Sequence, residues 1–165
     1  MTAGSNRSIG DRPAQVVFAV LVLACFAAFF LTQRLKHTPT AVQRFMLTPR
    51  FSPSTPGPLE QERISFKLAK ADAATVTIID GQGNVVATLV RDRQLPRYKQ
   101  FSLRWNGRRG TAHRYSAIAT SHGHTILIPA TEGALAPPGE YRERVSLREQ
   151  ARSVLSPRSF TLVAG

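Results

Sequence analysis

Residues 16–31 form an uninterrupted apolar run, VVFAVLVLACFAAFFL, in which the thiol of Cys25 is the most polar side chain. With its flanking residues the run approaches the roughly 20 residues that a helix needs to cross about 30 Å of hydrocarbon. Pro13 stands at the entrance, where the first turn of a helix tolerates proline. A helix buried in a soluble domain usually keeps a polar face, which this run lacks. We therefore predict one transmembrane helix over residues 13–35, held in a lipid bilayer.

Two other fates of such a segment are a cleaved signal peptide and a lipoprotein signal. The sequence VLAC at 22–25 loosely resembles a bacterial lipobox, but Phe26 follows where a lipidated cysteine usually has a small or polar neighbour. A cleavage site of small residues before polar ones is missing, because residues 29–31 continue the apolar run. The retained anchor is favoured, with Cys25 as an apolar filler, and both alternatives stay open.

The chain is strongly basic, with 22 Lys and Arg against 10 Asp and Glu and a formal charge of +12. Residues 1–12, expected to be a disordered tail, contribute Arg7, Asp11 and Arg12, so nearly all of the excess lies beyond them. The single cysteine excludes an intramolecular disulfide and a zinc site built on several cysteines. A basic domain beside a membrane attracts polyanions such as lipid head groups, anionic polymers, acidic proteins or nucleic acids.

Residues 36–62 change character, with five prolines between positions 39 and 58. Proline at this density prevents a helix and favours an extended, semi-rigid backbone. We predict a linker that holds a domain off the membrane, with one short strand at 42–47.

From residue 63 to residue 163, apolar and polar side chains alternate as they do in half-buried strands. The segment DGQGN at 80–84 supplies the turn residues of a hairpin. Long helical periodicity does not occur after residue 36. The pattern predicts an all-β fold, an antiparallel β-sandwich, behind a single N-terminal helix. Its largest core residues are expected to be Phe66, Phe101, Trp105 and Tyr141.

Five segments in order are ISFKL (64–68), TVTIIDGQGNVVATL (75–89), LRWNGR (103–108), PPGEYRERVSL (137–147) and PRSFTL (157–162). Together they resemble the FlgD-type Ig-like domain, the Ig-like module of flagellar hook-capping proteins, which also occurs in bacterial surface proteins. The resemblance covers about residues 60–163 and implies an Ig-like or FnIII-like sandwich. Its signature positions, which we interpret as scaffold residues, are Trp105, Asn106, Gly107, Pro138, Gly139 and Tyr141.

The chain departs from this family at two places. The family's Asn/Asp-rich loop is replaced by FSPSTPG at 51–57, so no cation site is expected there. The segment 109–136 is longer than its family counterpart, and we predict an extra hairpin of residues 115–120 and 125–128 within it. Because long insertions are often functional, this loop is our first candidate for a binding surface. We expect that residues 111–135 can be removed without loss of the fold.

Catalytic chemistry and a bound cofactor are not expected, because the sequence has no G-x-S-x-G motif and no phosphate-binding glycine-rich motif. His122 and His124 have the spacing of a metal-chelating pair on a strand, but they fall in an expected turn and His113 is the only nearby third ligand. Glutamates and arginines alternate between residues 140 and 149, which we interpret as a solvated ladder of ion pairs.

The candidate binding surface consists of basic side chains, namely Arg91, Arg93, Arg97, Lys99, Arg108, Arg109, Arg114, His122 and His124. Aromatic residues are not interleaved with them and nucleic-acid motifs are missing, so nucleic acid is the less favoured alternative. We expect a non-enzymatic module for scaffolding or for binding a protein or an anionic polymer at the bacterial cell envelope. The family resemblance implies a domain outside the cytoplasmic membrane. The Lys and Arg count of the helix flanks favours the opposite orientation.

Overall fold

The computed structural model describes residues 11–36, 40–119 and 124–164, and the chain divides into two compact units between Pro39 and Thr40. The first unit contains helix α1 (Asp11–Lys36). Its segment Ala14–Gln33 has a mean hydropathy of 2.6 and is long and apolar enough to cross a membrane. A signal sequence near an N-terminus can meet the same criteria of length and hydropathy. The expected tail, apart from residues 11 and 12, lies outside the described residues.

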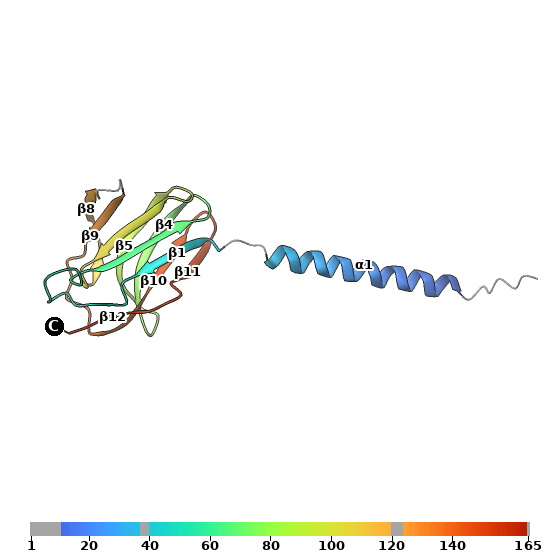
Figure 1. Cartoon of the computed structure of the whole chain (residues 1–165), viewed down its shortest axis with the longest axis horizontal. Coiled ribbons are helices and arrows are strands. Elements are labelled where there is room, and N and C mark those ends of the chain that lie inside the picture. Colours follow the sequence, from blue (N-terminus) through green and yellow to red (C-terminus); the bar gives the residue numbers. More distant parts are fainter. Residues whose placement is uncertain (1–10, 37–39, 120–123, 165) are drawn as a thin grey trace, which may run out of the picture. The chain divides into compact units, whose positions relative to one another are not determined.

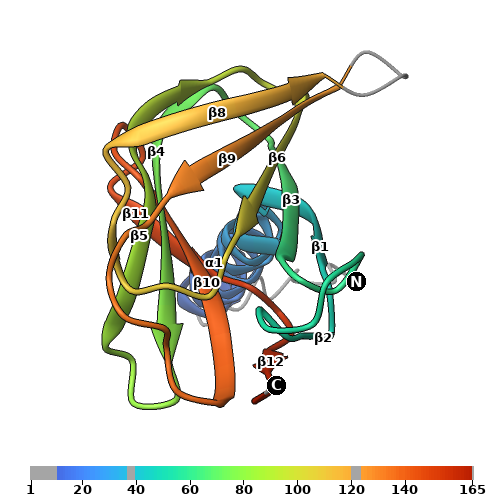
Figure 2. The same cartoon turned by 90° about the vertical axis from the view of Figure 1, so that its left-hand side faces the viewer.

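The described part of the second unit is built from strands (Figure 1). They are β1 (Val42–Leu47), β2 (Arg50–Phe51), β3 (Glu62–Leu68), β4 (Asp72–Asp80), β5 (Val85–Leu95), β6 (Gln100–Trp105), β7 (Gly110–Thr111), β8 (Arg114–Ala119), β9 (Thr125–Ala130), β10 (Gly139–Leu147), β11 (Arg152–Leu155) and β12 (Phe160–Leu162). Within the described residues they form two sheets, in the orders β1-β3-β6-β9-β8 and β2-β12-β10-β4-β5-β7, with β11 also paired to β10 (Figure 2). The predicted β-rich fold with one apolar N-terminal helix is therefore confirmed.

The core follows from the alternation in the sequence. In β3 the residues Ile64, Phe66 and Leu68 are buried and the residues between them are more exposed, as a period of two requires. Strand β10 has the same pattern in the other sheet. Most of the buried apolar residues of both sheets belong to one cluster. Of the predicted core residues, Phe66, Trp105 and Tyr141 are buried, and Phe101 packs against the cluster while partly exposed.

Four aromatic rings from different strands meet at the centre of this cluster. The ring centroid of Trp105 lies 5.6 Å from Phe51, 5.8 Å from Tyr141 and 6.1 Å from Phe160. The polar atoms of the rings are also satisfied, because the Trp105 indole donates to the carbonyl of Arg108 at 2.8 Å. The Tyr141 hydroxyl donates to the carbonyl of Pro137 at 2.5 Å. Burial of such rings without these partners would cost free energy.

The turn after β6 is held by side-chain hydrogen bonds. The Oδ1 atom of Asn106 accepts hydrogen bonds from the Arg108 amide at 3.0 Å and from the Thr131 hydroxyl at 2.7 Å. Gly107 has a φ of +77°, and a Cβ atom there would approach the Cγ atom of Pro53 to 2.7 Å. The turn therefore requires glycine for both its backbone angle and its packing.

The prediction of purely antiparallel sheets is wrong, because the sheets are mixed. Strand β9 runs parallel to β6, β7 runs parallel to β5, and β2 runs parallel to β12. Parallel neighbours need a long connection between them. Residues 106–124 provide that connection for β6 and β9, because the chain crosses to β7 and then forms β8 before it returns as β9.

Part of the segment expected as a linker belongs to the second unit, which begins at Thr40. Strand β1 pairs with β3 along one edge of the five-stranded sheet, and β2 pairs with β12. Phe51, at the end of β2, is completely buried. The short strand predicted at 42–47 is β1, whereas the two-residue strand β2 was not predicted within this proline-rich segment.

The insertion 109–136 contains the predicted hairpin, formed by the antiparallel strands β8 and β9 (Figure 2). Residues 121–123 of the turn expected at 121–124, and residue 120 of the first predicted strand, lie outside the described residues. Strand β8 is exposed along its whole length, whereas Leu127 of β9 is buried in the core. Because β9 is an inner strand of its sheet, the structure argues against a dispensable segment 111–135.

The expected ion-pair ladder at residues 140–149 is not formed as predicted. Glu143 is completely buried, because it shares the inward face of β10 with Tyr141 and Val145. Neither of its carboxyl oxygens has a hydrogen-bond partner among the residues that the structure describes. Burial, together with the charge of Glu62 in the other sheet, raises the pKa of Glu143 well above its ordinary value. Burial also raises the pKa of Glu62 to about 8, against the opposing effect of a hydrogen bond from the Thr48 amide.

Replacement of Phe51 tests whether residues 40–62 belong to the folded unit. We expect Phe51→Ala to lower the free energy of unfolding by about 3–5 kcal/mol, because it leaves a cavity beside Trp105. Leu59→Ala in the same proline-rich segment is the control, since Leu59 is half exposed, and it should change stability by about 0.5 kcal/mol or less. Denaturant unfolding of the full chain in neutral micelles measures both. Equal effects of the two variants would contradict the assignment.

The two buried glutamates predict an unusual pH dependence. Because burial raises the pKa of Glu62 from 4.5 to about 8, the folded domain binds more protons than the unfolded chain between these values. The contribution of Glu62 to stability should therefore be fully present below about pH 4.5 and be lost as the pH rises towards 8, whereas the lowered pKa values of Asp72 and Asp80 act in the opposite direction at acidic pH. Glu62→Gln keeps an acceptor for the Thr48 amide and should stabilise the domain at pH 8 more than at pH 5. Glu140→Gln, at an exposed position, should leave the profile unchanged; a flat wild-type profile would contradict the prediction.

Candidate functional site

Three of the predicted basic residues lie together around one pocket of about 570 Å³. Arg93 is near the end of β5, Lys99 is in the connection to β6, and His124 directly precedes β9. Lys67 of β3 joins them, because the sheet register pairs it with Gln100. The basic pocket, as we call it, is the set of Lys67, Arg93, Lys99 and His124 over a floor that includes Leu95, Phe101 and Leu127.

The connection from β5 to β6 has a strained but anchored backbone. The amide of Tyr98, which lines the pocket, donates to the carbonyl of Leu68 at 2.9 Å. Tyr98 has a φ of +58°, a conformation that is uncommon for residues other than glycine. The guanidinium of Arg97 stacks on the Tyr98 ring, 4.4 Å from its centroid, and donates to the Tyr98 hydroxyl at 2.8 Å. These contacts anchor the connection directly before Lys99.

The electrostatics of the basic pocket favour an anion. None of the described residues that line it carries a carboxylate. Like charges gathered in a concave site repel one another, and a bound anion relieves that repulsion while the low-dielectric walls strengthen its attraction. The apolar floor lets the aliphatic stems of the lysines pack while their ammonium groups reach solvent.

Acidic side chains of the domain are used elsewhere. Asp80 accepts hydrogen bonds from the amides of Gln82 and Asn84 in the β4–β5 turn, and its hydrogen bonds, led by that from the Asn84 side chain, lower its pKa. Asp72 is buried, which raises its pKa, but hydrogen bonds from Glu149 and Gln150 outweigh this effect and the net shift is downward. These carboxylates stabilise turns and do not line the basic pocket.

The other predicted site residues do not join the basic pocket. Arg91 and Arg97 are exposed and do not line it, and Arg114 forms an ion pair with Glu132. Arg108 and Arg109 line two smaller pockets that also contain carboxylates, those of Glu60 and of Asp80 and Glu140 respectively. His122 lies outside the described residues. Among the described residues, no group of three His, Cys, Asp or Glu side chains is placed to hold a metal ion.

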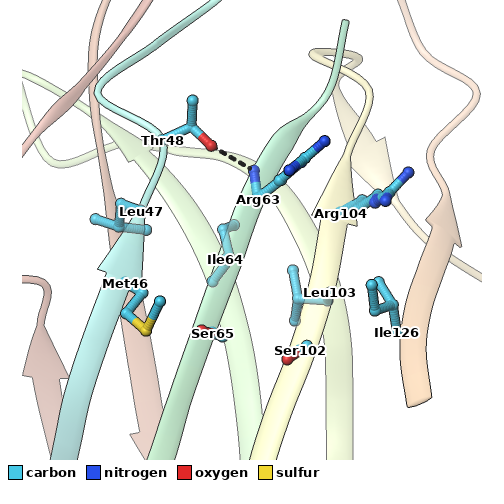
Figure 3. A pocket seen from close by; sticks show the side chains of 10 residues that line it. All are labelled: Met46, Leu47, Thr48, Arg63, Ile64, Ser65, Ser102, Leu103, Arg104 and Ile126. Carbon is cyan, nitrogen blue, oxygen red and sulfur yellow. Dashed lines mark hydrogen bonds between the residues drawn. The ribbon is translucent and has the colours of Figure 1, made fainter. Parts of the chain in front are cut away.

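A second basic feature escaped the sequence analysis. Arg63 of β3 and Arg104 of β6 line a groove of about 310 Å³ in the five-stranded sheet (Figure 3). Ser65 and Ser102 line the same groove, two residues further along these strands. The alternation in the sequence indicates that each arginine points away from the core. Their pairing depends on the register between strands, which the alternation does not reveal.

Comparison of the sequence with protein-family models and with curated proteins finds no match.

Proposed function

We propose that the chain is a membrane-anchored, non-enzymatic Ig-like module that binds an anionic polymer at the bacterial cell envelope. The observation that carries this proposal is the basic pocket, in which Lys67, Arg93, Lys99 and His124 surround one concavity without a carboxylate among its described lining residues. A flexible polyanion is recognised chiefly through clustered cations, which Lys67, Arg93 and Lys99 provide here.

Several features support an Ig-like β-sandwich. Two sheets contribute to one apolar cluster, and Trp105 lies completely buried within it. The hydrogen bond from the Tyr141 hydroxyl back to the Pro137 carbonyl resembles the tyrosine corner of Ig-like domains. The signature positions at 105–107 and 138–141 lie at the turns and strand ends where the resemblance to FlgD-type domains implies structural roles.

Helix α1 supports the membrane anchor. It is long and apolar enough to span a bilayer, and only residues 37–41 separate its end at Lys36 from the first strand at Val42. The hydroxyl of Thr32 donates to the Ala28 carbonyl at 2.6 Å, so this polar group is satisfied within the helix. The proposed location outside the cytoplasmic membrane comes from the family resemblance.

Binding of a protein partner is a second candidate, favoured by strand β8. All six residues of β8 are exposed, and β8 forms the end of the five-stranded sheet. Tyr115 and Ile118 are large apolar side chains on this strand with 40% and 45% of their surface exposed. An open strand of this kind pairs readily with an extended segment of another chain.

Polyanion binding can be tested with inorganic polyphosphate and the full chain in neutral micelles. We expect the triple variant Lys67→Gln, Arg93→Gln, Lys99→Gln to reduce the slope of log Kobs against log salt by about 2, since each lost phosphate contact contributes about 0.7. The control removes three exposed arginines elsewhere, Arg50, Arg152 and Arg158, and should reduce the slope much less. If both triple variants behave alike, the pocket has no special role.

The same titration with a single-stranded oligonucleotide separates the nucleic-acid alternative. We expect oligonucleotide binding to fall away by about 150 mM salt, because attraction without base contacts is purely electrostatic. Tight binding that survives this salt concentration would favour nucleic acid as the natural partner.

The orientation of the domain can be measured with a reporter enzyme that is active only outside the cytoplasm, fused after Gly165. We expect an active fusion, since long domains are translocated with little regard to the charge of the helix flanks. A fusion that is stably produced but inactive would place the domain in the cytoplasm and exclude an envelope ligand.

A further inference from the structure

We propose that the outer face of strands β3 and β6 carries a discrete site for a phosphate group, formed by Arg63, Arg104, Ser65 and Ser102. The site shares no lining residue with the basic pocket and does not depend on the function proposed for that pocket.

The sheet register brings the two arginines together. Arg63 and Arg104 are directly opposite each other in the antiparallel pair of β3 and β6. Opposite residues in such a pair have Cβ atoms about 4.5–5.5 Å apart, and like charges at this position destabilise the sheet. Both side chains extend from the same side of the sheet, next to each other (Figure 3). The backbone of β3 is held in place at Arg63, because the Arg63 amide donates a hydrogen bond to the Thr48 hydroxyl at 3.3 Å.

The charges of this pair are not balanced within the described chain. The ion pairs found among the described residues are Arg114 with Glu132 and Arg148 with Asp92, and neither involves the β3–β6 pair. The Nε atom of Arg104 is buried and has no hydrogen-bond partner among the described residues. A buried donor of this kind costs free energy unless an acceptor reaches it. An oxyanion between the two guanidinium groups would supply that acceptor and remove the repulsion.

Two hydroxyl groups extend the row of donors. Ser65 and Ser102 are opposite each other, two residues further along the same strands. The Ser102 oxygen accepts a hydrogen bond from the Gln100 side chain at 3.5 Å, which leaves its own proton free to donate. The two guanidinium groups are planar and permanently charged. Together with the two hydroxyl groups they can donate hydrogen bonds to the several oxygens of a phosphate group.

The surroundings of the row are apolar. Met46 of β1 has 61% of its surface exposed and lines the groove with Ile126 of β9. None of the ten described residues that line the groove is acidic. The site recognises a phosphate group. This group is either free or part of a lipid head group, in which case the apolar part of the lipid covers Met46.

The test uses the full chain in neutral micelles and two measurements, thermal unfolding and titration calorimetry. The probes are inorganic pyrophosphate and micelle-incorporated phosphatidylglycerol, each compared with sodium chloride at equal ionic strength. We expect at least one phosphate probe to raise the melting temperature of the wild type beyond the chloride effect. The double variant Arg63→Gln, Arg104→Gln should weaken binding at least tenfold. A response to both probes assigns the phosphate group alone, and a response to phosphatidylglycerol only assigns a lipid head group.

The ligand-free melting temperature separates binding from a structural role. Because the paired arginines repel each other, the double variant should melt at the same temperature as the wild type or higher. The control Arg152→Gln, Arg158→Gln should retain wild-type binding, as should the triple variant of the basic pocket. The proposal is overturned if neither probe acts beyond ionic strength, if the double variant still binds, or if the control pair weakens binding equally. A lower melting temperature of the ligand-free double variant would also overturn it.

Discussion

The contacts of Trp105 with Phe51, Tyr141 and Phe160 connect strands that are far apart in the sequence. Trp105 ends β6 in one sheet, whereas the other three rings come from β2, β10 and β12 in the second sheet. The turns at Arg108 and at Pro137 are attached to this cluster, because the indole donates a hydrogen bond to the Arg108 carbonyl and the Tyr141 hydroxyl donates to the carbonyl of Pro137. The positions of the basic side chains on the outer surfaces thus depend on the packing of these rings.

Alternation along single strands was the most reliable signal in the sequence. It correctly predicted the inward phase of β3 and β6 and the burial of Trp105 and Tyr141. The same alternation places Glu143 inside, but its charge and its arginine neighbours favoured a surface interpretation. In the structure Glu143 is buried, as its position in the alternation of β10 requires. Phe51 was missed for another reason, since its two-residue strand is too short to show any period.

Candidate site residues were less predictable than the fold, because a site combines strands whose register is fixed only by tertiary packing. Arg93 and Lys99 are close in sequence and could be grouped from it, whereas Lys67 joins them through its pairing with Gln100. The opposition of Arg63 and Arg104 is likewise a property of register. Parallel pairing of β6 with β9 was unpredictable from pattern, since alternation is identical in parallel and antiparallel strands facing one core.

Strand β1 has a mechanical consequence. It follows helix α1 after five residues and forms the edge of its sheet, paired on one side to β3. A pull on an anchored helix therefore reaches the domain first through the hydrogen bonds between β1 and β3. Met46 and Thr48, at the end of this strand and just beyond it, border the groove that contains Arg63 and Arg104. If the helix is anchored as proposed, tension along the chain would thus first strain the β1–β3 pairing that borders this groove.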